Sequence, residues 1–341
     1  MMKSVVRSRS SLVLVALGIV CLFLPAILGE YLIHVMILIF FYAYLGQCWN
    51  ILGGYAGQLS IGHAAYYGIG AYTSTLLFTH LGLTPWLGMI AGGVAAMMLG
   101  LFTGYLCFRF GLKGPYFALA TLGFAEILRL ICLNMTSIGG AQGILIPLLG
   151  QDFLKFQFME RKFFYYIVFG MLILSIAVVT RIEKSRMGYY FRALHQNEDA
   201  AEALGIDITR YKLIAVGLSS FLTALGGTFY AQYTMYIEPE IMFGSFTSVD
   251  ILLRTIIGGA GTVYGPVIGS FILTPVSEIM RNVVGGGKSG INIMVFGIIV
   301  MLICIFMQKG ILPWLKARVS NYFGSENEDS ASEYVIKEGT S

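Results

Sequence analysis

Two pairs of oppositely charged residues stand at helical spacing inside apolar stretches of this 341-residue chain. Glu126 and Arg129 are three residues apart and Asp250 and Arg254 are four apart, so each pair shares one face of a helix. An isolated charge at the centre of a bilayer costs about 2.5–3.5 kcal/mol, and pairing within the helix relieves that cost. Each pair is therefore a structural ion pair or, alternatively, a contact for a solute with one charge of each sign, such as a zwitterionic amino acid.

Three further polar residues, Gln58, Ser60 and His63, directly follow a glycine cluster at 53–57. They are candidates for the polar lining of a pathway through the membrane. The alternative is that the glycines only let helices approach closely, as small residues do in membrane proteins. A second glycine cluster at 258–261 is what a duplicated fold would produce, although chance also produces such an echo in a chain with 42 glycines.

Other motifs resemble binding or catalytic sites without the full pattern. Gly285 to Ser289 reads Gly-Gly-Gly-Lys-Ser like a phosphate-binding loop, but Asn282 stands where that loop needs glycine, and the context of a soluble strand and helix is missing. The four histidines lack metal-ligand spacing, and the five cysteines form no CxxC pair. We therefore expect no bound metal, no cofactor and no catalytic residues in this chain.

Composition places the chain in a membrane. Hydrophobic residues make up 57% and charged residues 12%, and the mean hydropathy is +0.78, so the chain cannot cover a globule with water-compatible surface. The net charge of +4 is too small and too dispersed for a nucleic-acid partner. These values predict an all-α fold, a polytopic transmembrane bundle of about eight to ten spans.

Apolar runs of about 20 residues give the positions of these spans. We expect them within a transmembrane domain at 11–318, at 11–29, 31–52, 63–80, 86–108, 115–134, 163–180, 213–235, 246–263, 264–280 and 292–308. The glycine-rich segments 53–70 and 258–269 are not clear spans, and the sequence leaves open whether either is a broken or re-entrant helix. Basic residues precede the first run, as in a signal peptide, but no cleavage site follows it. We therefore expect a retained helix there and not a signal peptide.

Basic residues divide unequally when the spans alternate from a cytoplasmic amino terminus. Fourteen fall on the cytoplasmic side and five outside, as the positive-inside rule requires, provided that 246–263 and 264–280 both cross or neither does. Segment 1–10, the loop at 181–212 and the tail at 319–341 are then cytoplasmic. The tail has no apolar period and is expected to be disordered.

The loop at 181–212 is the main polar interruption and holds 11 of the chain's charged residues. Apolar residues recur in it at helical spacing, and Gly205 stands where such a helix would end. This pattern predicts a short amphipathic helix whose alanines let another protein approach closely. The alternative is an ordinary interfacial helix lying on lipid headgroups.

The run Asp199 to Gly205, D-A-A-x-x-x-G, resembles the EAA loop with which permeases of ATP-binding-cassette importers engage their ATPase subunits, with Asp in place of the usual Glu. Three further blocks agree in order, and together they resemble the LivM-type permeases of the branched-chain amino acid transporter family over roughly 45 to 315. The blocks are Gly53 to Ala65, Thr121 to Arg129, Ala200 to Ile206, and Gly258 to Thr262 with Gly265-Pro266. The distal Leu-Pro of the general EAA pattern is missing.

This resemblance implies a subunit of an importer in a prokaryotic inner membrane. Its partners would be two ABC ATPase subunits that use ATP, a second homologous permease and an extracytoplasmic solute-binding protein. The solute would be a branched-chain or related small amino acid, and the permease itself would be no enzyme. The implied coupling loop consists of Arg192, Glu198, Asp199, Ala200, Ala201 and Gly205.

Three rival functions differ in their requirements. A permease for urea or short amides is the rival within the family. A secondary transporter or channel would need no ATPase, and the D-A-A-x-x-x-G loop argues against it. An integral membrane enzyme would need a catalytic cluster near the interface, and none is recognisable in the sequence.

Overall fold

The protein is described by a computed structural model that covers residues 18, 20–148, 150 and 152–284 and isolated positions between 294 and 314. In this part of the chain the regular structure is helical except for two short strands, so the expected all-α class is confirmed. The strands β1 (Ile144–Leu145) and β2 (Tyr236–Ile237) pair antiparallel, with Ile144 opposite Ile237. The expected span 292–308 lies largely outside the described residues, and the segments 1–10 and 319–341 lie wholly outside them. Of the expected span 11–29, residues 18 and 20–29 are described, and the chain there is helical up to the turn at 24–26.

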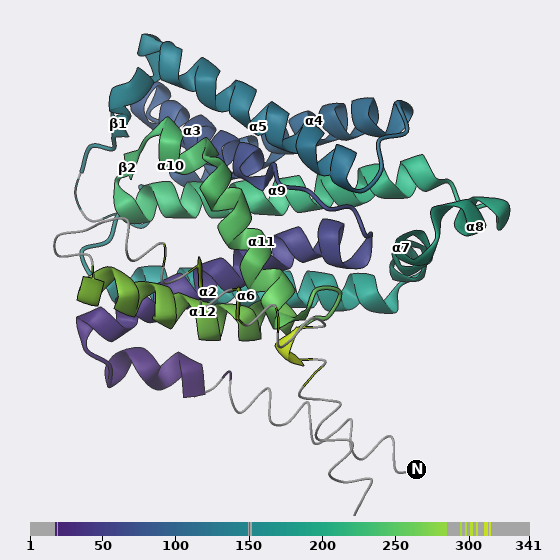
Figure 1. Cartoon of the computed structure of the whole chain (residues 1–341). Coiled ribbons are helices and arrows are strands. Elements are labelled where there is room, and N and C mark those ends of the chain that lie inside the picture. Colours follow the sequence, from purple (N-terminus) through teal and green to yellow (C-terminus); the bar gives the residue numbers. More distant parts are fainter. Residues whose placement is uncertain are drawn as a thin grey trace, which may run out of the picture.

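The long helices lie side by side along one direction (Figure 1). Among the described residues, five of these helices are long and apolar enough to cross a membrane, including α2 together with the π-helical turn η2 that follows it. The chain is therefore a multi-pass membrane protein. The long helices are α2 (Glu30–Asn50), α3 (His63–Leu81), α4 (Pro85–Arg109), α5 (Pro115–Asn134), α6 (Arg161–Lys184), α9 (Ile208–Thr234) and α12 (Gly265–Val284).

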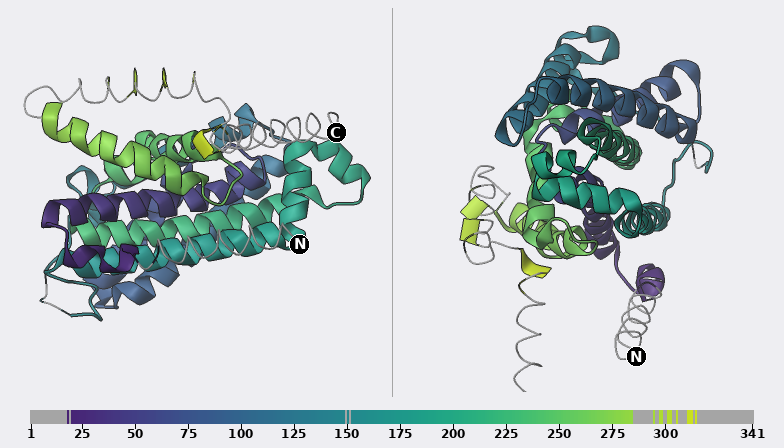
Figure 2. Two further views of the ribbon diagram at one scale, coloured as in Figure 1. Left: turned by 90° about the horizontal axis from the view of Figure 1, so that it is seen from below. Right: turned by 90° about the vertical axis from the view of Figure 1, so that its right-hand side faces the viewer.

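Short elements gather at the two ends of the bundle. One end carries the strands with the 3-10 turns η3 (Thr136–Ile138) and η4 (Gly140–Gln142), and we name it the sheet end. The other end, the α8 end, carries α7 (Arg186–Gln196) and α8 (Glu198–Ala203), which project beyond the long helices (Figure 2). A further 3-10 turn, η1 (Leu24–Ala26), precedes α2.

The first glycine-rich segment is a tight reversal. Helix α2 passes into η2 (Ile51–Tyr55), and α3 then runs without a break from His63 to Leu81. Helical structure is therefore interrupted within 53–70, at 56–62, and the expected span at 63–80 coincides with the unbroken α3. A β-carbon at Gly62 would lie 2.2 Å from the carbonyl oxygen of Thr121, so glycine here lets the reversal pass directly against α5.

A broken element, α10 (Pro239–Phe243) with α11 (Ser245–Gly259), precedes the second glycine-rich segment at 258–269, and that segment holds the turn between α11 and α12. The short helix α10 ends at Gly244, and α11 then crosses the bundle obliquely before the chain turns into α12 (Figure 1). With 15 residues α11 is about 22 Å long, which is less than the hydrocarbon thickness of about 30 Å. The expected full span at 246–263 is thus corrected to a shorter, tilted helix.

Helices α2 and α9 form the centre of the bundle, with 72% and 67% of their apolar windows buried, against 28% for α5. Helices α3 and α9 touch through their backbones. A β-carbon at Gly227 would lie 1.9 Å from the Tyr67 carbonyl oxygen, and one at Gly70 would lie 2.0 Å from that of Ala224. Thr228 donates a hydrogen bond to the Gly70 carbonyl at 3.0 Å across the same contact. Small residues therefore set the distance between these two helices.

We predict that Gly227→Val sharply reduces the amount of folded protein, because the added methyl groups push α9 away from α3. Overpacking of this kind costs about 1–3 kcal/mol or more. Gly170→Val in α6 is the matched control, since it carries the same loss of helix propensity but a β-carbon there meets nothing within 4 Å. Fluorescence-detected size-exclusion chromatography of tagged variants measures the difference. Equal monodisperse peaks for both variants would refute the backbone contact.

Candidate functional site

The polar loop forms two helices, because Asn197 interrupts it. Asn197 is extended and its side chain accepts a hydrogen bond from the Ala200 backbone N–H at 3.1 Å, which starts α8. Ser185 caps α7 in the same way. Gly205 has a φ of +79°, a conformation that glycine adopts without strain, and ends the second helix where the sequence predicts.

Glu198 anchors α8 to three separate parts of the bundle. Its carboxylate lies 2.5 Å from Nζ of Lys212 in α9, accepts a hydrogen bond from Nε2 of Gln58 at 3.0 Å, and lies 3.3 Å from Nζ of Lys113 in the turn between α4 and α5. The Lys212 side chain is only 4% exposed and lies 5.2 Å from the centre of the Phe108 ring. A cation this deeply buried requires its carboxylate partner.

Electrostatics keep this anchor ionised at neutral pH. Burial alone would raise the pKa of Glu198, but the contacts with Lys212, Gln58 and Lys113 outweigh it and hold the pKa of that carboxyl below its usual value. Hydrogen bonds to Asp199 and Glu198 raise the pKa of Lys113. The anchoring contacts are therefore charge-assisted hydrogen bonds throughout the physiological pH range.

Helix α7 contacts the first glycine cluster, and that cluster contacts the second. Nδ1 of His195 lies 2.9 Å from the Gly54 carbonyl oxygen and donates to it. Asn50 accepts a hydrogen bond from the Gly261 N–H at 2.8 Å and donates one to the Thr262 carbonyl at 2.9 Å. The two glycine clusters that the sequence analysis noted thus meet in space, and they connect α7 to the turn between α11 and α12.

The outer face of α8 is small and apolar. Ala200, Ala203 and Leu204 are exposed. The exposed fraction of Leu204 is 81%, so this residue makes little contact with the rest of the chain. Ala201 is 2% exposed and faces inward, so its expected place on a docking surface is wrong. In a helix of this length, residues three and four apart share a face, and the outward face passes through Ala200 and Leu204.

The remaining loop residues lie around this face. Arg192 pairs with Glu183 at 2.8 Å, and Asp199 pairs with Lys113 at 3.1 Å; Gly205 is exposed. These pairs involve exposed side chains and contribute little stability in water. They add charge around the apolar tip formed by Leu204.

Ser60 and His63, expected as pathway lining, are fully buried between α2, α3 and α9. The Ser219 hydroxyl donates to the Cys48 carbonyl at 2.7 Å, so it accepts from Nε2 of His63 at 2.8 Å. The other ring nitrogen of His63 then accepts from the Ser60 hydroxyl at 3.1 Å. In this conformation His63 joins three helices, which favours the packing interpretation over the pathway one.

Both predicted charge pairs form, and each gains an additional partner. Nε of Arg129 donates to Glu126 at 3.0 Å, and its Nη1 reaches Glu240 in α10, a residue that the sequence analysis did not select. Arg254 pairs with Asp250 and is 1% exposed; its guanidinium lies 3.7 Å from the centre of the Tyr42 ring. Nothing local in the sequence signals Glu240, because it is 111 residues from Arg129.

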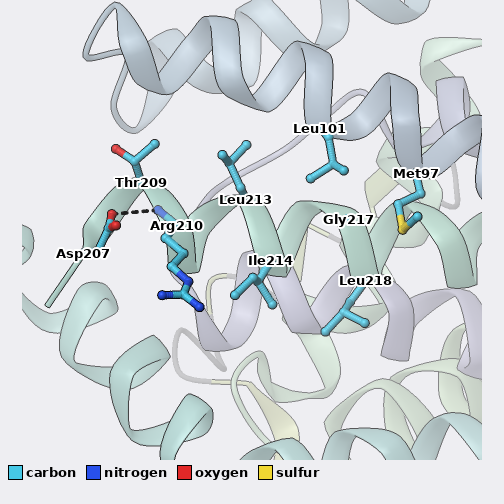
Figure 3. A pocket seen from close by; sticks show the side chains of 9 residues that line it. All are labelled: Met97, Leu101, Asp207, Thr209, Arg210, Leu213, Ile214, Gly217 and Leu218. Atoms are coloured by element: carbon cyan, nitrogen blue, oxygen red, sulfur yellow. Dashed lines mark hydrogen bonds between the residues drawn. The ribbon is translucent and has the colours of Figure 1, made fainter.

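A groove of about 730 Å³ runs between α4 and α9 and begins beside the α8 end (Figure 3). Its walls are the apolar side chains of Met97, Leu101, Leu213 and Leu218. At its rim the Asp207 carboxylate accepts from the Arg210 backbone N–H at 3.0 Å, which caps α9. The groove lies between two apolar helices and suits hydrocarbon better than a charged solute.

Comparisons with known proteins agree with this architecture. Residues 31–307 match the family model described as the permease component of the branched-chain amino acid transport system. The chain is 30% identical to the high-affinity branched-chain amino acid transport permease LivM of Escherichia coli K12, over 95% of this chain and 80% of that protein. It is 26% identical to a probable LivM of Methanocaldococcus jannaschii, over 73% and 78%. It is 24% identical to LivH of Escherichia coli K12, over 68% and 79%. No solved structure matches.

We predict that Glu198→Gln destabilises the protein by about 3–5 kcal/mol, because it leaves Lys212 buried and uncompensated. Adding Lys212→Gln should restore much of the loss, since the double variant buries no charge. Thermal unfolding of the purified variants measures both effects. Glu202→Gln, exposed on the same helix, is the control and should match the wild type. A double variant that is as unstable as the sum of the two single variants would contradict the pairing.

Proposed function

The chain belongs to the family of permease components of branched-chain amino acid transport systems, and we propose that it forms the translocation pathway of an ATP-driven importer for branched-chain or related small amino acids. ATP would be hydrolysed by partner subunits, and the permease would bind no cofactor of its own. The observation that carries this proposal is α8, a short helix with an apolar tip whose base is tied into the bundle by Glu198.

The tip of α8 has the chemistry of a docking surface. Leu204 is 81% exposed at the end of a helix that is itself rigidly held. A single exposed leucine flanked by alanines fits a shallow apolar pocket on another protein, and burial of such a side chain contributes about 1.5–3 kcal/mol. The surrounding charges of Asp199 and Glu202 would set the orientation of the partner.

The contacts of α7 and α8 supply a route for the motion. Displacement of α8 by an ATPase acts through Glu198 on α9 and on Gln58, and through His195 on the carbonyl of Gly54. Asn50 continues the route to Gly261 in the turn between α11 and α12. A rigid helix pushed at one end thereby shifts the shorter, tilted α11, as in other interface-driven transitions.

The assembly and its orientation follow from the same proposal. Two ATPase subunits would dock at the α8 end, a second homologous permease would complete the pathway, and a binding protein would deliver solute at the sheet end. The α8 end would face the cytoplasm of a prokaryotic cell, because the unequal division of basic residues favours that side.

We expect Leu204→Asp and Ala200→Glu to yield membrane-inserted protein of normal abundance that no longer retains its ATPase partner and supports no uptake. The charged side chains disrupt the interface but meet only solvent in the free chain. Affinity purification from the native host and uptake of radiolabelled leucine measure the two effects. Leu154→Asp, at an exposed leucine of the sheet end, is the control and should retain the ATPase. Undiminished uptake after ATP depletion with the membrane potential clamped would reject an ATP-driven importer.

We also expect single cysteines at Glu202 and Leu154 to react from opposite sides of the membrane. In a cysteine-free background, an impermeant maleimide should label Leu154→Cys in intact cells and Glu202→Cys only after permeabilisation, because both positions are exposed but lie at opposite ends of the bundle. Mass shift on a gel measures the labelling. Reaction of Glu202→Cys in intact cells would invert the proposed orientation.

A further inference from the structure

A cavity of about 380 Å³ lies in the sheet-end half of the bundle, where the broken element α10–α11 meets α12. Tyr42 and Tyr230, from the central helices α2 and α9, also contribute to its wall. Its volume falls within the range of about 300–1,000 Å³ that small-molecule sites occupy. Unlike the apolar groove between α4 and α9, it carries three carboxylates on its wall, those of Glu240, Asp250 and Glu278.

Two of these carboxylates have strong partners. Glu240 is bound by Arg129, which also holds Glu126. Asp250 is bound by Arg254, and that arginine is fixed further by the Thr274 hydroxyl at 3.3 Å and by the Tyr42 ring. Glu240 and Asp250 thus line the cavity while the arginines behind them hold their carboxylates in fixed positions.

Glu278 is different. Its side chain is only 7% exposed, yet its ion pair is a loose contact of 3.5 Å with Nη1 of Arg281, whose own side chain is 65% exposed. Within the described part of the chain no group donates a hydrogen bond to this carboxylate. A buried carboxylate normally accepts two or three hydrogen bonds. One that lines a cavity without them is unsatisfied and would be stabilised by a cationic group in that cavity.

A free α-amino acid supplies the missing groups. Its ammonium carries three N–H donors, which can reach the carboxylates of Glu278 and Asp250. Its carboxylate can replace Glu278 as the partner of Arg281, because a guanidinium binds a carboxylate with two parallel hydrogen bonds. Ile241, Phe246 and Met280 line the same cavity and offer an apolar surface for an aliphatic side chain.

We propose that this cavity is the solute-contacting site of the chain, in which Glu278 and Asp250 receive the α-ammonium of an aliphatic amino acid and Arg281 receives its α-carboxylate. This rests on the proposed transport function. The loose pair between Glu278 and Arg281 opens to admit the two charged groups of the solute and closes again after it leaves. Because Glu278 and Arg281 pair with each other again when the solute leaves, the site binds the solute weakly enough to release it. Transport requires such release.

Position along α12 links the cavity to the rest of the bundle. Pro275 lies inside this helix, three residues before Glu278, and its missing N–H leaves the carbonyl of Phe271 without its helical partner. The segment between Gly265 and Pro275 adjoins the turn held by Asn50. Glu278 and Arg281 therefore stand beyond Pro275, where a helix bends most easily, on the part of α12 farther from the turn.

The test uses photo-leucine, a diazirine analogue of leucine, on the full chain purified with its partner subunits. Irradiation should label peptides of α10, α11 or α12 in the wild type, and excess leucine should compete, whereas the corresponding 2-oxo acid, which lacks the ammonium, should not. Glu278→Gln should lower labelling and ATP-dependent leucine uptake at least tenfold. Glu160→Gln, an exposed glutamate at the same end of the bundle, is the matched control and should label like the wild type.

A second variant covers the case in which Glu278→Gln does not fold. Arg281→Gln alters an exposed side chain and should fold normally, and it should also lower photo-leucine labelling, because the α-carboxylate of the solute then lacks the guanidinium. Wild-type labelling in Glu278→Gln or Arg281→Gln, or labelling confined to other helices, would overturn the proposal. Failure of the transport function would show differently, as normal labelling of the cavity together with leucine uptake that ignores ATP depletion.

Discussion

Direct contact between helix backbones is the constraint on which this bundle depends. In lipid, apolar side chains gain little by leaving hydrocarbon, so helices associate where small residues let their backbones touch. Gly227 against Tyr67 joins α9 to α3, and Gly258 against Gly265 closes the hairpin of α11 and α12, where a β-carbon would lie 1.8 Å from a carbonyl oxygen. These contacts also fix where the buried charges stand, since Arg254 and Glu278 both lie on that hairpin.

Much of the fold was predictable, because the length of an apolar run in a spanning helix must match the thickness of the hydrocarbon core. The expected span 115–134 coincides with α5, and 86–108 differs from α4 by one residue at each end. Hydropathy failed at 246–263, where an apolar segment forms a helix too short to cross the membrane. Composition does not reveal this early end, since Gly259 and Gly261 turn the chain through positive φ angles of 120° and 74° and not through polarity.

The candidate sites were predictable only as far as local geometry reaches. Spacing along one helix correctly paired Glu126 with Arg129, and the capping pattern around Gly205 marked the end of α8. The sequence also contains a signal for the second helix of the loop: Asn197 followed by two acidic residues is a typical helix start, and it divides the loop into two helices. The inward position of Ala201 and the contact of His195 with Gly54 depend on packing between distant segments, which no local pattern encodes.

The π-helical turn at the end of α2 sets how the chain that follows it is rotated about the axis of that helix. A π turn holds one residue more than an α turn, and such an extra residue is tolerated where a function uses it. If Ile51–Tyr55 reverted to α geometry, everything beyond it would rotate by about 100°, the angle of one helical residue. The Gly54 carbonyl would then turn away from His195. The contact of α7 with the end of α2 consequently depends on that single additional residue.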